Sequence, residues 1–152
     1  MAGILGNNSS LTSKAQELAK SVVGETAPEQ NGIPTAKIIL SDMKLRGVDP
    51  KAGLTGMLAA QKQGVLKLWR KDNTIMAAQK LNSIAAKVHF FTMDPEPQFQ
   101  QIVKGFVDTL KQNGCKVFYD VVVDPHIVRA LQAAGAHLQP SDNPQFKLKV
   151  IL

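Results

Sequence analysis

The sequence predicts an α+β domain with a central mixed sheet, in which an antiparallel meander is followed by a β-α-β-α-β unit. Three observations predict this class. Residues 65–92 hold three strand-like segments separated by turn residues, and a strongly amphipathic helix follows them directly. Residues 115–152 then alternate apolar strand segments with another short helix. Adjacent strands followed by alternating helices and strands are typical of an α+β fold, here preceded by an N-terminal helical arm.

The N-terminal arm, residues 1–32, is expected to be separable from an α/β domain formed by residues 33–152. A chain of 152 residues with 44% hydrophobic content supports one ordinary core. Within the arm, residues 13–16 match a capping box and predict a short helix over 14–23. Its apolar stripe is narrow, so this helix either folds onto the domain or docks on a neighbour. Residues 25–32 have the composition of a flexible linker.

Two short helices should lie between the arm and the sheet. Pro34 suits the start of the first helix, and Gly47 its end. Asp49 can cap the second, which is expected to stop before Gly64. The domain therefore begins with a helical pair.

Three strands should form the antiparallel meander. Val65–Arg70, Thr74–Leu81 and Ile84–Thr92 are rich in apolar and β-branched residues. Lys71–Asn73 and Asn82–Ser83 have the chemistry of tight turns. Segments this close in sequence are expected to pair with one another as antiparallel neighbours.

The helix after the meander carries the clearest periodic signal in the chain. Its apolar residues recur on a single face, which should pack against the sheet: Phe99, Ile102, Val103, Phe106, Val107 and Leu110. Gly114 ends this helix, and Cys115–Val123 is a nearly continuous apolar strand that we expect to be buried on both faces. Asp124 then caps a short helix that Gly135 ends. Phe146–Leu152 closes the sheet as a half-exposed strand.

Composition places weak constraints on partners. The formal charge of +6 favours polyanions at low salt, and the densest basic run, Lys62–Lys71, surrounds Trp69. A solvated strand face is the preferred explanation of this run, with weak nucleic-acid contact as the alternative. No apolar stretch is long enough for a membrane span, and the first residues lack a secretory pattern. The single cysteine, Cys115, is interpreted as a packed thiol.

The C-terminal half resembles a known family. Asp124–Ala136, followed by His137 and then Pro144–Leu148, looks like the fourth helix and the last two strands of the GCN5-related N-acetyltransferase (GNAT) fold. The order helix, helix, three antiparallel strands, helix, strand, helix, strand is similar to that fold without its usual first strand. This resemblance implies an acetyltransferase-like domain over residues 33–152.

Within that superfamily, the chain is most similar to the acetyltransferase-like small internal virion proteins of short-tailed bacteriophages. They carry a helix of comparable form before a polar turn and a final Phe-rich strand. In this sequence His126, Ile127, Leu131, Gly135 and Ala136 stand in comparable places. The resemblance implies a structural protein that is made in the host cytoplasm and located in the virion.

The segment before the amphipathic helix departs from the family pattern. Working acetyltransferases of this fold hold the coenzyme A pyrophosphate on a glycine-rich loop, whose backbone N–H groups reach the phosphates. Here Asp94–Pro97 supplies two prolines and two acids, so we expect pyrophosphate binding in that mode to fail. Where the family often has a general-acid tyrosine, this chain has Leu131. Tyr119 is a conceivable substitute, and a core tyrosine with a satisfied hydroxyl is the preferred interpretation.

No catalytic, cofactor-binding or metal-binding residue is assigned from the sequence. His89, His126 and His137 never fall at the close spacing of metal ligands. His89 is either a surface-facing residue of its strand or a hydrogen-bonded core residue. Asp120 and Asp124 lie four residues apart, but no partner for either carboxylate is identifiable.

The leading hypothesis from the sequence is a non-catalytic structural or assembly protein of a bacteriophage particle. It would be built on a degenerate acetyltransferase-like fold that binds no cofactor, and would join a multimeric assembly through residues 1–32. The alternative is an acyl-CoA-dependent N-acyltransferase with an atypical cofactor loop. A third class is a nucleic-acid-binding protein that uses the Lys62–Lys71 region.

Overall fold

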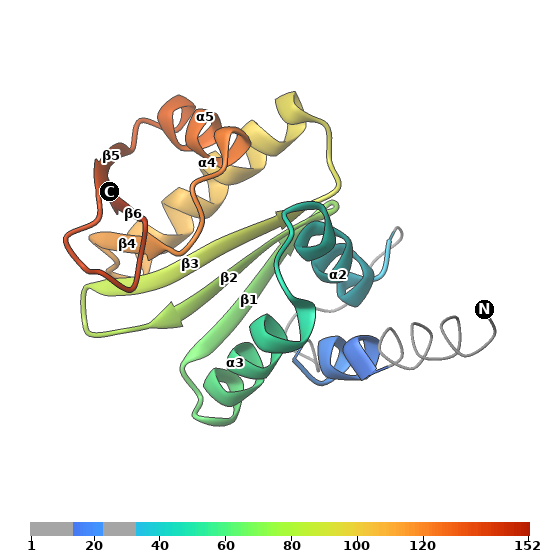
Figure 1. Cartoon of the computed structure of the whole chain (residues 1–152). Coiled ribbons are helices and arrows are strands. Elements are labelled where there is room, and N and C mark those ends of the chain that lie inside the picture. The colour runs from blue at the N-terminus through green and yellow to red at the C-terminus, as the bar shows by residue number, and fades with distance from the viewer. Residues whose placement is uncertain (1–13, 23–32) are drawn as a thin grey trace.

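A six-stranded mixed sheet with helices on both faces forms the centre of the molecule (Figure 1). The computed structural model describes residues 14–22 and 33–152; the expected linker and the first residues of the arm lie outside these ranges. The strand order is β1-β2-β3-β4-β6-β5. This confirms the α+β class with a mixed sheet, and the element order matches the predicted one apart from an additional strand, β5. No helix in the described ranges has both the length and the apolar character to cross a membrane.

A helical segment at residues 14–22 precedes the labelled elements. These then run, in chain order, as α2 (Thr35–Leu45), α3 (Pro50–Lys62), β1 (Leu66–Lys71), β2 (Thr74–Lys80), β3 (Ala85–Thr92), α4 (Glu96–Gln112), β4 (Val117–Asp120), α5 (Pro125–Ala133), β5 (His137–Pro140) and β6 (Leu148–Ile151). Strand β5 is the element that the residue pattern alone did not predict, although the family resemblance implied it.

The three-stranded meander forms as predicted. A two-residue turn joins β1 to β2, and Asp72 in this turn has a φ of 51°. Asp is one of the few non-glycine types that tolerate this left-handed conformation. Strands β1 and β2 pair from Leu66 opposite Gln79 to Lys71 opposite Thr74. Because β1 pairs only with β2, it forms one edge of the sheet.

Strand β4 is shorter than the sequence predicts. The expected strand over Cys115–Val123 contains only four strand residues, Val117–Asp120, and the residues after them form a loop. The reason is local: the Asp120 carboxylate accepts a hydrogen bond from the backbone N–H of Val122, which turns the chain toward α5. The prediction of burial on both faces is therefore wrong for Val121 and Val123, which are 39% and 51% exposed.

Two hydrophobic cores lie on opposite faces of the sheet. On one face, the predicted apolar side of α4 packs with α5 around Phe90, whose ring lies 6.3–6.4 Å from the rings of Phe99, Phe106 and Phe118. On the other face lie α2, α3 and the helix at residues 14–22. Ala19 and Val22 of that helix are fully buried in the second core, so this helix folds onto the domain.

We predict that Phe90→Ala lowers the free energy of unfolding by about 3–5 kcal/mol, because it removes the ring at the centre of the first core. The measurement is chemical denaturation monitored by circular dichroism. Leu45→Ala is the control: Leu45 is 90% exposed, and surface changes of this kind usually stay within about 0.5 kcal/mol. Equal losses in the two variants would contradict the assignment of this core.

Candidate functional site

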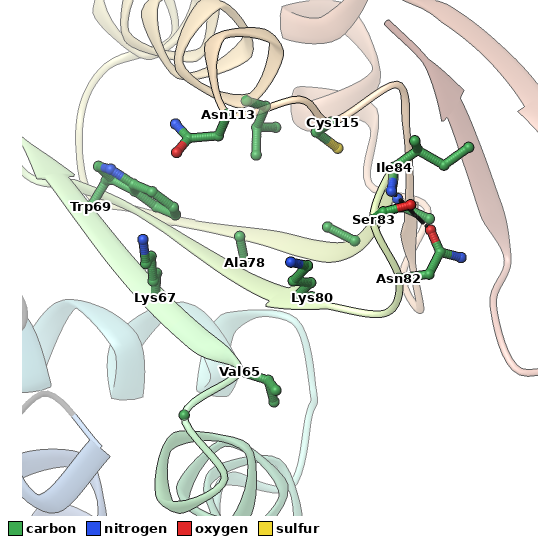
Figure 2. A pocket seen from close by; sticks show the side chains of 14 residues that line it. Val65, Lys67, Trp69, Ala78, Lys80, Asn82, Ser83, Ile84, Asn113 and Cys115 are labelled. Atoms are coloured by element: carbon green, nitrogen blue, oxygen red, sulfur yellow. Dashed lines mark hydrogen bonds between the residues drawn. The ribbon is translucent and has the colours of Figure 1, made fainter.

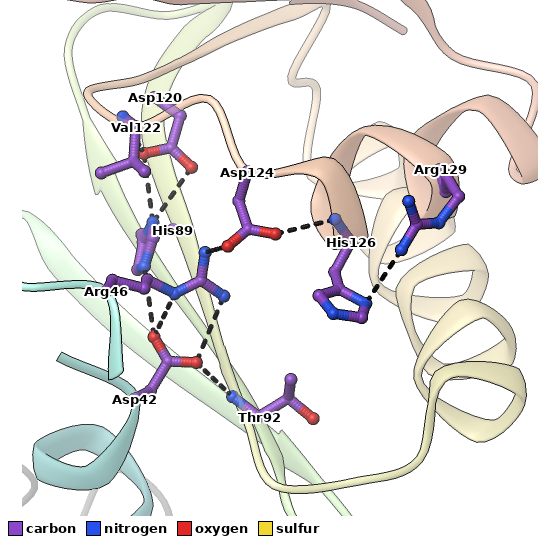
Figure 3. A network of polar contacts seen from close by, with 9 residues as sticks. All are labelled: Asp42, Arg46, His89, Thr92, Asp120, Val122, Asp124, His126 and Arg129. Carbon is purple, nitrogen blue, oxygen red and sulfur yellow. Dashed lines mark hydrogen bonds and ion pairs between the residues drawn. The ribbon is translucent and has the colours of Figure 1, made fainter. Parts of the chain in front are cut away.

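The candidate site lies where the two parallel strands of the sheet part. Strands β3 and β4 pair over only three positions, from Ala85 opposite Val117 to Lys87 opposite Tyr119. Beyond these positions β3 continues to Thr92, while β4 ends at Asp120. His89 and Asp120 come from the two strands just past the last pair. A cluster of charged side chains occupies this position (Figure 3).

Three carboxylates and two cationic side chains make up this cluster, which we call the charge network: Asp42, Arg46, His89, Asp120 and Asp124. His89 Nδ1 lies 3.0 Å from an oxygen of Asp120, and its Nε2 lies 3.8 Å from Asp42. Arg46 Nε lies 2.5 Å from Asp42 Oδ1, the same oxygen that His89 Nε2 faces. A second Arg46 nitrogen donates to Asp124 Oδ2. Every anion of the network therefore faces at least one cation.

Four elements position the network. Asp42 and Arg46 lie one turn apart on α2, so they point in the same direction. Asp42 also accepts a hydrogen bond of 3.0 Å from the backbone N–H of Thr92 at the end of β3. Asp124 caps α5, where its other oxygen accepts from His126 N at 2.7 Å. The network thus connects α2, β3, β4 and the start of α5.

The network is largely withdrawn from solvent. The side chains of Asp120 and Asp42 are 1% and 3% exposed, that of Arg46 is 8% exposed and that of His89 is 16% exposed. Unpaired charges at such depth would be strongly destabilising, whereas paired and hydrogen-bonded ones are tolerated. No buried side-chain nitrogen or oxygen in the described part of the chain lacks a hydrogen-bond partner.

His89 is held in its charged form. Burial by itself lowers the pKa of this imidazole and is the largest single influence on it. The hydrogen bonds to Asp120 and Asp42 together outweigh burial and raise the pKa to about 9. For Asp42, burial is again the largest single influence and raises the pKa, but the hydrogen bonds from His89 and Arg46 leave the pKa below its ordinary value. At neutral pH the pair is therefore an imidazolium and a carboxylate.

These protonation states limit the chemistry of the site. An imidazolium with a pKa of about 9 cannot accept a proton at neutral pH, and both of its nitrogens already face carboxylates. The paired Asp42 is a weaker base than an ordinary aspartate, because its pKa is lowered. The geometry therefore suits a network that holds α2, β3, β4 and α5 together better than it suits a general base for acyl transfer.

A small cavity of about 180 Å³ adjoins the network on the α2 and α3 side of the sheet. Its walls are mostly apolar and include Met43, Met57 and Phe91, with Arg46 and His89 at its polar end. The volume is below the roughly 300–1,000 Å³ of typical small-molecule sites. A short apolar group fits this space, and a whole cofactor does not.

The loop between β3 and α4 forms hydrogen bonds within the protein. One oxygen of Asp94 accepts hydrogen bonds from the backbone N–H of Asn73 at 3.0 Å and from the Thr74 hydroxyl at 2.7 Å. This carboxylate therefore fastens the β1–β2 turn to the loop. Helix α4 begins after Pro95, with Glu96 in its first turn and no side-chain cap. The structure thus gives the Asp94 carboxylate a structural role.

Few backbone donors are present at the start of α4. Pro95 and Pro97 have no N–H group, and the N–H of Phe99 donates to the carbonyl of Pro95 at 2.9 Å. Glu96 places a carboxylate in the first turn and pairs with Arg129 of α5. This geometry is a poor receptor for a diphosphate, which needs several N–H groups and no competing anion.

The other residues considered in the sequence lie apart from the network. Leu131 is fully buried. The Tyr119 hydroxyl donates to Asp142 at 3.2 Å, and its ring stacks on Phe146, so it is a half-buried residue with a satisfied hydroxyl. The Cys115 thiol is half-buried and donates a hydrogen bond to the carbonyl of Val117. Burial raises the pKa of this thiol.

The three histidines are separated in space as in sequence. His126 faces Glu96 and Arg129, and His137 is exposed on β5. The sequence left two alternatives for His89, and the structure shows the second, a residue that is hydrogen-bonded inside the fold. In residues 14–22 and 33–152, no group of three or more His, Cys, Asp or Glu side chains is arranged to hold a metal ion.

Sequence reasoning missed two members of the network and the pairing of two others. Asp42 and Arg46 were not singled out, although Asp42 falls between Ile39 and Met43 on the inward face of its helix. A charged residue on an apolar face, with an opposite charge four residues later, is the signal that could have found them. Partners for Asp120 and Asp124 were not identifiable, because they come from distant segments.

One cation of the basic region Lys62–Lys71, Arg70, forms hydrogen bonds within the fold. Arg70 donates to Thr35 Oγ1 at 2.7 Å and to the carbonyls of Ile33 and Asp72. It therefore connects the hairpin to the start of α2. Lys67 and Lys71, by contrast, are exposed.

Comparison with known proteins adds a distant likeness in fold. No protein-family model matches the chain, and no curated protein matches it in sequence. Among solved structures, the chain is similar to a protein of Salmonella typhimurium described provisionally as an acetyltransferase and solved with acetyl-CoA. The TM-score is 0.45 at 9% identity, and the alignment covers 78% of this chain and 87% of the other. Similarity at this level does not extend to the chemistry of the site.

We predict that the stability of the protein falls as the pH rises from about 6.5 to about 9. The folded state raises the pKa of His89 to about 9, so its contribution is fully present below about pH 6.5 and is lost as the pH rises through the folded pKa. A shift of this size corresponds to about 3 kcal/mol. Urea denaturation at a series of pH values measures this.

His89→Gln should remove most of this pH dependence, whatever its effect on stability at neutral pH. His126→Gln is the matched control, because the His126 side chain is 58% exposed and lies outside the network. If the His89→Gln variant keeps the same decline between pH 6.5 and 9, the network does not hold His89 charged.

Proposed function

We propose that the chain is a non-catalytic structural protein of a bacteriophage virion, built on an acetyltransferase-like fold that no longer binds acyl-CoA. The observation that carries the non-catalytic part is the start of α4. There, the cofactor loop expected from the family resemblance is replaced by Asp94–Pro97. Asp94 binds the β1–β2 turn, the two prolines withhold N–H groups, and Glu96 adds negative charge.

The charge network supports the same proposal. Acyl transfer to an amine needs a base that accepts a proton near neutral pH. His89 is charged there, and the Asp42 carboxylate is stabilised by its ion pairs. Leu131 also stands, fully buried, where the family often has a general-acid tyrosine. These three features favour a scaffold over the alternative, an acyl-CoA-dependent N-acyltransferase.

The virion part of the proposal depends on the resemblance of the His126–Ala136 helix to the small internal virion proteins. In this proposal the protein is made in the host cytoplasm and joins other protein subunits through the N-terminal arm. Residues 14–22 of the arm belong to the core of the domain. The partner contact is therefore assigned to residues 1–13. Weak nucleic-acid contact through Lys62–Lys71 would use the exposed lysines, since Arg70 is engaged within the fold.

We predict that acetyl-CoA at millimolar concentration gives no larger thermal shift than AMP, which is an adenine nucleotide without the diphosphate and the acyl arm. A ligand present at 100 times its dissociation constant would stabilise the native state by about 2.7 kcal/mol, which thermal denaturation detects easily. Desulfo-coenzyme A is the matched control, since it tests the same pyrophosphate contacts without the acyl group. A shift with both ligands that clearly exceeds the shift with AMP would support the acyltransferase alternative and reject the scaffold proposal.

We also predict that deletion of residues 1–13 leaves a folded protein that no longer assembles. The helix at residues 14–22 remains in this variant, so the second core is complete. Native mass spectrometry gives the assembly state, and circular dichroism confirms the fold. An unchanged oligomer after the deletion would refute the role of the arm.

A further inference from the structure

A second hollow lies on the opposite face of the sheet, beside the C-terminal end of α4. Its volume is about 240 Å³. Figure 2 shows it between the edge of the meander and the end of the helix, with Lys67, Trp69 and Lys80 on the strands and Asn113 and Cys115 above them. Neither the charge network nor the α4 N-terminus touches it. Lys67 and Trp69 belong to the Lys62–Lys71 region named above for weak nucleic-acid contact, so the inference below rests on that part of the proposed function and gives it a defined site.

The hollow exists because the sheet carries small side chains at this point. Ala78 of β2 and Ala86 of β3 form its floor, while Trp69 and Leu110 form walls. The pairing of Lys67 with Ala78 and of Lys80 with Ala86 shows that all four residues lie on the same face of the sheet. Larger residues at the two alanines would fill the space.

Two cations border the apolar floor. Lys67 and Lys80 are diagonal neighbours across β1 and β2, at a distance that lets both flexible side chains reach one anion. Both residues are exposed, and no carboxylate of the described residues forms an ion pair with either. An anion placed between them would gain two charge-assisted hydrogen bonds.

The lining of the hollow also includes uncharged hydrogen-bonding groups. Asn113 uses its amide nitrogen to donate to the Thr109 carbonyl at 2.7 Å, which leaves its amide oxygen as the acceptor. Ser83 adds a hydroxyl to the lining. Both residues are exposed, and a heteroaromatic ring placed beside them can exchange hydrogen bonds with them, which an aliphatic chain cannot do.

We propose that this hollow is a binding site for a nucleotide, with the base against Trp69 and the phosphate between Lys67 and Lys80. Indole faces are sequence-tolerant stacking platforms for bases, and flanking cations neutralise phosphates. At about 240 Å³ this hollow is also smaller than a typical small-molecule site, so it admits one ring system and leaves the phosphate at the rim. The ligand is either a free nucleotide or a nucleotide of a single strand, since both present the same base and phosphate.

The protein contains a single tryptophan, so its fluorescence reports directly on this site. AMP at millimolar concentration is expected to quench the emission of Trp69 in the full chain. Adenosine should bind at least about tenfold more weakly, because it lacks the phosphate that the lysines contact. Absence of quenching, or equal binding of adenosine and AMP, would overturn the proposal.

Charge variants test the geometry with the fold preserved. Lys67→Gln and Lys80→Gln should each weaken AMP about tenfold, as expected for one charge-assisted phosphate contact. Lys71→Gln is the matched control: it removes the same charge from the same strand, four residues along and outside the lining. An equal loss in the Lys71→Gln variant would indicate nonspecific electrostatics and would overturn the site.

A short single-stranded oligoadenylate distinguishes the two sources of the nucleotide. If it binds at least tenfold more tightly than AMP, with an affinity that falls as salt rises, the ligand is a single strand. If it binds no more tightly than AMP, the ligand is a free nucleotide. Either result, combined with the Lys67→Gln and Lys80→Gln losses, supports the site. Acetyl-CoA also carries an adenine nucleotide, so its thermal shift is measured in the Lys67→Gln variant as well. A shift that this variant loses reports on the present site, whereas a shift that it keeps bears on the proposed function.

Discussion

The structure depends on the burial of two cations among three carboxylates at the place where β3 and β4 separate. A sheet that opens in its middle loses backbone hydrogen bonds there, and the loop after Asp120 must be held by side chains. The charge network does this by joining α2, both strands and the cap of α5. Removing one partner of a buried ion pair commonly costs about 3–5 kcal/mol, so each member depends on the others.

This constraint also bears on function. The network leaves no neutral imidazole and no free carboxylate for proton transfer at the opening between the strands. The loop between β3 and α4 is also held by internal contacts, because Asp94 accepts hydrogen bonds from the β1–β2 turn. Polar groups of the kind that bind a substrate in an enzyme form hydrogen bonds and ion pairs with one another here. A domain organised in this way is suited to a fixed shape.

The two faces of the sheet differ in what they leave open. On the α2 and α3 side, the cavity is small and ends at the charge network. On the α4 side, the alanines of β2 and β3 leave a hollow bordered by lysines and Trp69. The two spaces therefore favour different ligands: the first an apolar group, the second an anion that carries a ring.

The sequence by itself determined the helices of the domain, their ends and the three-stranded meander. The α4 periodicity and the four helix-ending glycines, all with positive φ, are encoded within a few residues: Gly47, Gly64, Gly114 and Gly135. Tertiary structure alone decided the packing of the helix at residues 14–22 and the charge network. The Arg46–Asp124 pair joins residues 78 positions apart, and no local pattern reports such a contact. Capping and periodicity are local properties of the chain, whereas the pairing of buried charges depends on which segments the complete sheet brings together.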